Sequence, residues 1–257
     1  MLEVSLNGVI RVWQRNMDVY RRFFVNRLIT SSLYPLLFLF AMGYGVGGYI
    51  GKIEGIPYIK FIAPGVLCSA VMFAASFATT YGTYIKMRFQ KTFGAIISTP
   101  VSIDETIVGE VLWGATRGLI DGMIIYAVTV AFRLPDTLWS LLIIPFSFVF
   151  GIVFSLLGVL VTAIISNIEQ FDYYLSCFIS LMFLFSGTFF PLSRLPQVFQ
   201  KFSWILPLTH VIKITRPLFL GEIPPNAIFE FLWLIILIII VFPIVLILMR
   251  KRILEFS

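Results

Sequence analysis

Long apolar segments alternate with shorter polar connections along this chain. A helix that crosses the hydrocarbon core of a bilayer needs about 20 mostly apolar residues. Six segments satisfy this requirement, and the fifth of them is the shortest: residues 28–50, 61–82, 106–132, 138–166, 173–190 and 228–249. The pattern predicts an all-α membrane protein with six transmembrane helices.

The first 27 residues are too polar to span a bilayer, but they have a helical period of their own. Apolar residues recur there at spacings of three and four, and the arginines fall on another face. This pattern predicts an amphipathic helix over residues 1–27 that lies in the cytoplasmic interface. No internal repeat or linker divides the remainder, so we expect one membrane domain over residues 28–257.

Composition and charge agree with a bilayer as the solvent. The chain is 59% hydrophobic and 12% charged, whereas globular domains carry about 25% charged residues. The net charge of +6 comes from basic residues beside the apolar segments, which indicates membrane orientation and no nucleic-acid partner. Lys and Arg are most numerous before the first span, between spans two and three, and after span six. Both termini are therefore predicted to be cytoplasmic.

The third span carries three charged residues on one helix face. Glu110, Arg117 and Asp121 are separated by seven and four residues, and charges at membrane depth are candidates for function. In one interpretation Arg117 pairs with Asp121 while Glu110 lies near the cytoplasmic interface; in the other, the three form a proton relay. Three glycines on this helix would let a neighbouring helix approach closely: Gly114, Gly118 and Gly122.

Metal and nucleotide sites are not indicated. One histidine and two cysteines do not make a usual zinc ligand set. Cys68 and Cys177 both lie in apolar segments, and we expect them to be buried, inert thiols. The sequence has no G-x-x-x-x-G-K-[ST] motif, so we expect no ATP bound through a P-loop and no cofactor or catalytic residue in this chain.

The connection between spans two and three is longer than a tight turn requires. Basic and apolar residues alternate from Tyr84, Pro100 stops this segment, and Ser102 with Glu105 starts the next helix. The pattern predicts a short amphipathic helix in the cytoplasm. Another protein could grip such a helix, or the helix could rest on lipid headgroups.

Two stretches of the chain resemble a known family. They are "KTFGAIISTPVSIDETIVGEVLWGATRG" (Lys91–Gly118) and "FSGTFFPLSRLPQVFQKFSWILPLTHVIKITRPLFLG" (Phe185–Gly221). Both resemble the permease subunits of type-2 ABC exporters, and the second is most similar to lipo-oligosaccharide exporter permeases of the nodulation-factor type. The resemblance covers almost the whole chain.

The resemblance implies a permease homodimer, or a heterodimer, in the bacterial inner membrane above two separate ATPase subunits that hold ATP and Mg. The substrate would be an amphipathic glycolipid or lipo-oligosaccharide, and a hydrophobic drug or polyketide is the alternative. An ATP-independent membrane scaffold or enzyme is the alternative from another class.

The resemblance also implies roles for two segments. Residues 84–100 correspond to the coupling helix that docks on the ATPase, with the candidates Lys86, Arg88, Phe89, Lys91 and Phe93. The segment after span five corresponds to a broken helical hairpin that re-enters the outer leaflet, and it supplies the candidates for an outer gate or substrate path: Ser186, Gly187, Phe189, Phe190, Pro191 and His210.

The hairpin segment contains three prolines, and each proline tends to end or start a helix. Pro191, Pro196 and Pro207 would therefore divide it into short helices. Its aromatic rings favour an interfacial position. The segment either plugs the outer mouth of a pathway or lies passively on lipid, and we expect His210 to be hydrogen-bonded rather than a ligand.

Overall fold

The computed structural model describes the backbone of residues 5–256, and the side chains of these residues except 25–28, 30–32 and 256. The first half of the chain is helical apart from one short β-hairpin: α1 (Leu6–Arg22), α2 (Phe24–Phe40), η1 (Ala41–Val46), α3 (Gly47–Ile50), β1 (Lys52–Ile53), β2 (Ile56–Pro57), α4 (Tyr58–Thr79), α5 (Tyr81–Tyr84), η2 (Ile85–Phe89), α6 (Thr92–Ile97) and α7 (Ile103–Ala131).

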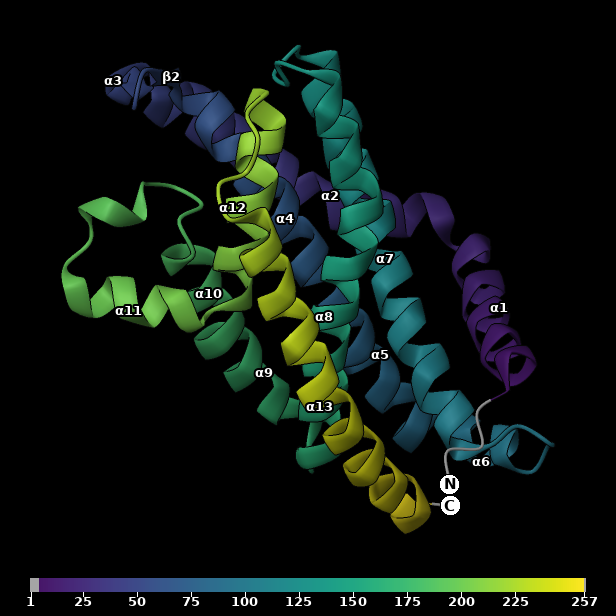
Figure 1. Cartoon of the computed structure of the whole chain (residues 1–257). Helices are drawn as coiled ribbons and strands as arrows, with labels where there is room; N and C mark the ends of the chain where they lie inside the picture. The colour runs from purple at the N-terminus through teal and green to yellow at the C-terminus, as the bar shows by residue number, and fades with distance from the viewer. Residues whose placement is uncertain (1–4, 257) are drawn as a thin grey trace.

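The second half of the described chain is also helical. Its elements are η3 (Leu138–Leu142), α8 (Ile143–Ile164), η4 (Ile168–Gln170), α9 (Phe171–Tyr173), η5 (Tyr174–Ile179), α10 (Ser180–Phe185), η6 (Leu192–Arg194), α11 (Gln197–Ile205), α12 (Pro207–Leu220) and α13 (Ala227–Phe256). The start of α1, the end of α13 and α6 lie at one end of the bundle, called the α6 end below (Figure 1). The β-hairpin lies at the opposite end.

Five helices in the described chain are long and apolar enough to cross a membrane. They are Leu33–Ile50, Tyr58–Phe89, Ile103–Ala131, Leu138–Ile164 and Ala227–Glu255. These helices confirm five of the six predicted spans. The remaining span, expected over residues 173–190, is a helix only from Phe171 to Phe185. The overall architecture is the predicted all-α membrane fold.

The central helix is α4, which packs against both α7 and α8. The glycines of α7 permit this packing. A Cβ atom at Gly114 would lie 2.5 Å from a Thr79 methyl carbon on α4 and 2.3 Å from Ser155 Oγ on α8, and one at Gly122 would lie 2.8 Å from a Val71 methyl carbon. Larger side chains would push the helices apart, so the predicted close approach is confirmed.

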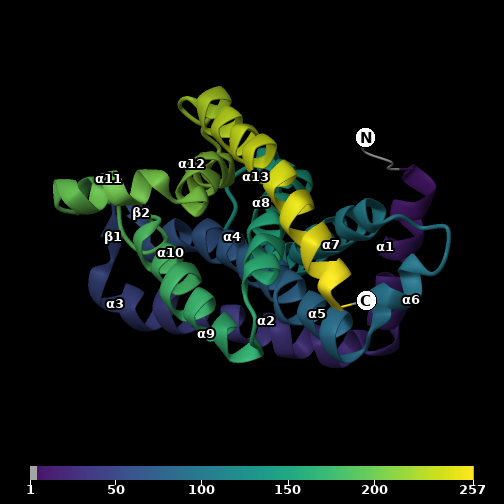
Figure 2. The ribbon, with the colours of Figure 1, turned by 90° about the horizontal axis from the view of Figure 1, so that it is seen from below.

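The N-terminal helix α1 is amphipathic, and it ends at Arg22. Its buried face includes Val9, Val12 and Tyr20, which pack against α7 rather than only on lipid. The contacts follow the two helices in order. Ser5, just before α1, donates its backbone N–H to Glu105 in the first turn of α7, and farther along Trp13 Nε1 donates to Thr116 Oγ1 at 2.9 Å. We expected this helix to lie in the interface; it runs beside the first half of α7 (Figure 2).

After the short fifth span, the chain forms a broken hairpin. Residues 186–190 bend, and each of the three prolines then stands at the beginning of a helix. Pro191 precedes η6, Pro196 precedes α11, and Pro207 is the first residue of α12. The predicted division of this segment by its prolines is confirmed.

Candidate functional site

A cavity of about 1030 Å³ extends from the α6 end toward the middle of the bundle. Side chains from α1, α2, α4, η2, α7 and α10 line it. At the α6 end the lining is polar, with Arg15, Asn16 and Lys86, whereas Phe73 and Phe77 on α4 line the deeper part. The cavity is therefore amphipathic, with a basic α6 end and a mainly aromatic interior that also holds Arg117 and Asp121.

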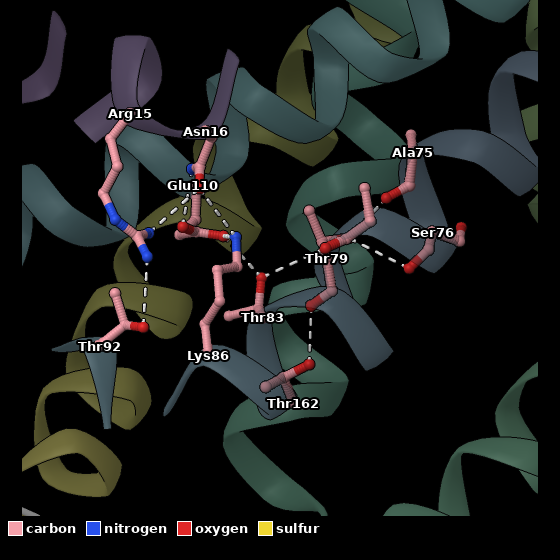
Figure 3. Close-up of polar contacts among 11 residues, drawn as sticks. Arg15, Asn16, Ala75, Ser76, Thr79, Thr83, Lys86, Thr92, Glu110 and Thr162 are labelled. Atoms are coloured by element: carbon pink, nitrogen blue, oxygen red, sulfur yellow. Dashed lines mark hydrogen bonds and ion pairs between the residues drawn. The ribbon is translucent and has the colours of Figure 1, made fainter. Parts of the chain in front are cut away.

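Glu110 lies beside the polar end of the cavity and joins three parts of the chain (Figure 3). Its carboxylate is 1% exposed and accepts hydrogen bonds from Asn16 Nδ2 on α1 and from Thr83 Oγ1 on α5, both at 2.9 Å. Lys86 Nζ forms an ion pair with the same carboxylate and donates to Asn16 Oδ1 at 3.3 Å. This network holds α1 and η2 against α7.

Arg117 and Asp121 form a separate pair about two to three turns farther along α7. Arg117 Nη2 lies 3.6 Å from Asp121 Oδ1, and both side chains are almost buried. The guanidinium also stacks over the Tyr20 ring at 4.4 Å. These contacts favour the structural interpretation of the pair, since Glu110 is bonded to Lys86 instead. A proton relay stays untested.

The expected coupling segment is partly used inside the chain. The helix of the second span continues through η2 to Phe89, and Lys91 adopts a left-handed turn (φ 49°) before α6 begins. Arg88, Phe89 and Lys91 are exposed at this tip. Phe93 is 1% exposed and packs in the chain's own hydrophobic core.

Two of the coupling candidates make their contacts inside the chain. Phe93 fills a core position and Lys86 pairs with Glu110, so neither side chain is presented at the surface for a partner. The amphipathic period identified the apolar side of α6 correctly, but that side packs on the chain itself.

Five candidates of the outer gate lie in the bend after α10 or directly after it. Ser186, Gly187 and Phe189 are buried, as is Pro191, while Phe190 is partly exposed. Gly187 has a φ of 83°, which favours glycine because other residues are strained there. A Gly187 substitution would therefore disturb the fold whatever the function of the bend.

Arg216 on α12 holds this bend in place. Its Nη2 donates to the Gly187 carbonyl at 2.5 Å, its Nε donates to the Phe61 carbonyl at 3.2 Å, and the guanidinium lies 3.9 Å from the centre of the Phe61 ring. No role was assigned to Arg216 from the sequence. An arginine among apolar residues of a helix was the available signal.

Four phenylalanine rings close the deep end of the cavity and are called the aromatic lid below. Phe189 contacts Phe38 and Phe183, with ring centres 5.4 and 4.9 Å apart, and Phe183 contacts Phe73 at 5.7 Å. Phe73 itself lines the cavity. Phe38 and Phe183 stand about one helical turn beyond the lining residues Tyr34 and Ser180.

His210 lies apart from this lid. It is fully buried, with Nδ1 bonded to Glu230 of α13 and Nε2 2.7 Å from the Trp204 carbonyl oxygen. Its ring stacks on Trp233 at 4.0 Å. The expected hydrogen bonding is confirmed, but the contacts place His210 between α12 and α13 rather than beside the cavity.

The two cysteines differ in their surroundings. Cys68 is buried, with Sγ 3.1 Å from Thr215 Oγ1. Cys177 on η5 is exposed, so the expectation that both thiols are buried is wrong. An apolar segment in a membrane protein can point outward because lipid covers its surface.

The family comparison agrees with this architecture. The family described as ABC-2 type transporter matches residues 8–220. The chain belongs to this family. Nodulation protein J of Rhizobium meliloti (strain 1021) is 34% identical over 83% of this chain and 81% of that protein. Nodulation protein J of Neorhizobium galegae is 29% identical over 98% and 96% of the two chains.

A more distant relative extends the comparison. Inner membrane transport permease YadH of Escherichia coli (strain K12) is 25% identical over 82% of both chains. Together with the apolar helices, the family makes this chain the multi-pass permease part of an ABC-2 type transporter. The predicted resemblance to type-2 ABC permeases is confirmed.

Proposed function

We propose that this permease works with separate ATPase subunits to export an amphipathic glycolipid or lipo-oligosaccharide across the bacterial inner membrane. The relatives named Nodulation protein J support this substrate class. The observation that carries the proposal is the cavity, whose polar residues Arg15, Asn16 and Lys86 lie at the α6 end and whose phenylalanines lie deeper. A polar head and an acyl tail match these two parts.

In this proposal the α6 end faces the cytoplasm. The start of α1 and the end of α13 lie there, and the end of α13 carries Arg250, Lys251 and Arg252, as the positive-inside rule requires of cytoplasmic connections. Both termini are then cytoplasmic. The exposed tip formed by Arg88, Phe89 and Lys91 faces the same way, where an ATPase subunit can dock on it.

A second copy of the chain would cover α2 and its continuation. Only 11% of the residues from Leu33 to Ile50 are buried, although the segment is apolar. Tyr34 and Leu37 are among its exposed side chains. A homodimer through this surface would place the two cavities on either side of a common seam.

Transport into inverted membrane vesicles tests the proposal. The vesicles would contain the full-length permease with the ATPase that co-purifies with it, and the measurement is ATP-dependent uptake of a radiolabelled lipo-oligosaccharide. Uptake should stop when the ATPase carries an inactivated P-loop lysine. Uptake of a hydrophobic drug alone would favour the alternative substrate class. If no ATPase co-purifies and uptake ignores ATP, the exporter function is wrong.

A further inference from the structure

The charges that line the cavity are not balanced. Arg15, Lys86 and Arg117 contribute three positive charges, and Asp121 contributes one negative charge. Glu110, which is not itself a lining residue, balances the charge of Lys86, and Asp121 balances the charge of Arg117. Arg15 is the basic residue left over, so the cavity carries an excess of positive charge at its α6 end.

The contacts of Arg15 are with neutral groups. Its guanidinium donates to Asn16 Oδ1 at 3.5 Å and to Thr92 Oγ1 at 3.3 Å, and the ion pairs found in the described part of the chain do not include it. Two neutral acceptors at these distances leave most of the donor capacity of a guanidinium unused.

Arg117 has unused capacity as well. Its Nη1 atom is buried and has no hydrogen-bond partner among the described residues. Buried donors are normally satisfied, because an unsatisfied one costs free energy. The side chain lines the cavity, so a rotation of the guanidinium would bring this covered nitrogen to an oxygen of a bound molecule.

We propose that the cavity selects amphipaths that carry an anionic group, such as a phosphate, sulfate or carboxylate, and that Arg15 receives this group at the α6 end while Arg117 offers a second donor about two turns deeper. Guanidinium groups present planar, charge-assisted donors that suit such oxyanions. The tail would lie along Phe73 and Phe77, beneath the aromatic lid. The inference rests on the proposed function only in treating the occupant as the transported substrate.

Binding of two matched probes tests the inference without ATP or the ATPase. The full-length permease in phosphatidylcholine nanodiscs is titrated with a lysophosphatidic acid and with a monoacylglycerol that share one fluorescently labelled acyl chain. The anionic probe should bind about tenfold more tightly, the difference expected for one charge-assisted hydrogen bond. Inorganic phosphate is added as a competitor, and it should displace the probe poorly because it has no tail.

Variants on one helix give the matched control. Arg15→Gln should remove the preference for the anionic probe, and Arg15→Lys should retain part of it. Arg21→Gln should change nothing, since the Arg21 side chain is 73% exposed and does not line the cavity. Arg117→Gln should weaken the anionic probe more than the neutral one, even if the variant is less stable.

Three results would overturn the inference. Equal affinity of the two probes for the unmodified permease would show that charge is not recognised. If Arg21→Gln lost the preference for the anionic probe as fully as Arg15→Gln, the preference would come from the general surface charge of the permease and not from the cavity. Full displacement by millimolar inorganic phosphate would identify a plain anion site with no role for the tail. None of these outcomes depends on whether the vesicles transport.

Discussion

The buried ion pair between Lys86 and Glu110 should be the most sensitive polar contact at the α6 end. Lys86→Met removes the cation and leaves the carboxylate of Glu110, which is 1% exposed, with the hydrogen bonds from Asn16 and Thr83 alone. Both remaining donors are neutral, so they cannot compensate the charge.

The magnitude follows from the burial. Removing one partner of a buried ion pair costs about 3–5 kcal/mol. The Lys86 side chain is 12% exposed and borders the cavity, and Glu110 keeps two donors, so we expect about 3 kcal/mol. For a chain of this size the unfolding midpoint falls by about 2–4 °C per kcal/mol. The midpoint of Lys86→Met should therefore fall by about 6–12 °C.

A double-mutant cycle separates the pair from its surroundings. Replacing Glu110 by Gln in the Lys86→Met background removes the buried charge, and at least half of the lost stability should return. The readout is the thermal midpoint of the purified permease by size-exclusion chromatography after heating. Lys60→Met is the control, because its partner Asp136 is 42% exposed and such a pair contributes about 0–1 kcal/mol.

Two outcomes would refute this reasoning. The first is a midpoint for Lys86→Met no lower than that for Lys60→Met. The second is additivity, in which the losses of the two single variants simply sum in the double variant.

Three further predictions concern docking, the bend and the lid. Phe89→Asp should leave the permease folded but abolish substrate-stimulated ATP hydrolysis by the partner, and normal stimulation would contradict the docking proposal. Phe93→Asp should instead prevent recovery of folded protein, because it places an unpaired charge in the core. Arg216→Met should loosen the bend that this side chain holds at the Gly187 carbonyl. A cysteine placed at Thr188, in a background without other cysteines, should then react faster with a thiol reagent. An unchanged rate would mean that Arg216 does not hold the bend. Phe189→Ala should open the aromatic lid and raise basal ATP turnover, and unchanged turnover would show that the ring closes nothing.

The sequence predicts most of the fold because long apolar runs are sufficient to identify membrane spans. It also predicts the helix starts at Pro191, Pro196 and Pro207, since proline acts locally. The end of the fifth helix is not predicted because residues 186–190 carry no charge and include two phenylalanines, and hydropathy does not register the left-handed backbone of Gly187.

Pairings across the chain could not be predicted in the same way. Arg216 reaches the Phe61 carbonyl over 155 positions, and Lys86 reaches Glu110 over 24. Neither spacing has a local signature. The period of α6 shows that Phe93 belongs to an apolar face, but period alone does not tell whether that face packs on the same chain or on a partner. For this reason the sequence does not separate the exposed docking candidates from the buried ones.

The short fifth helix has a consequence for the bilayer around it. From Phe171 to Phe185 a helix is about 22 Å long, while the hydrocarbon core is about 30 Å thick. The bilayer beside this helix must thin, or the hairpin must fill the missing depth. The exposed rings of Phe199, Phe202 and Trp204 on α11 suit the headgroup level, so the hairpin can fill the missing depth with interfacial side chains. Lipid next to the fifth helix therefore meets protein and interfacial side chains at a depth where the undisturbed membrane would hold only acyl chains.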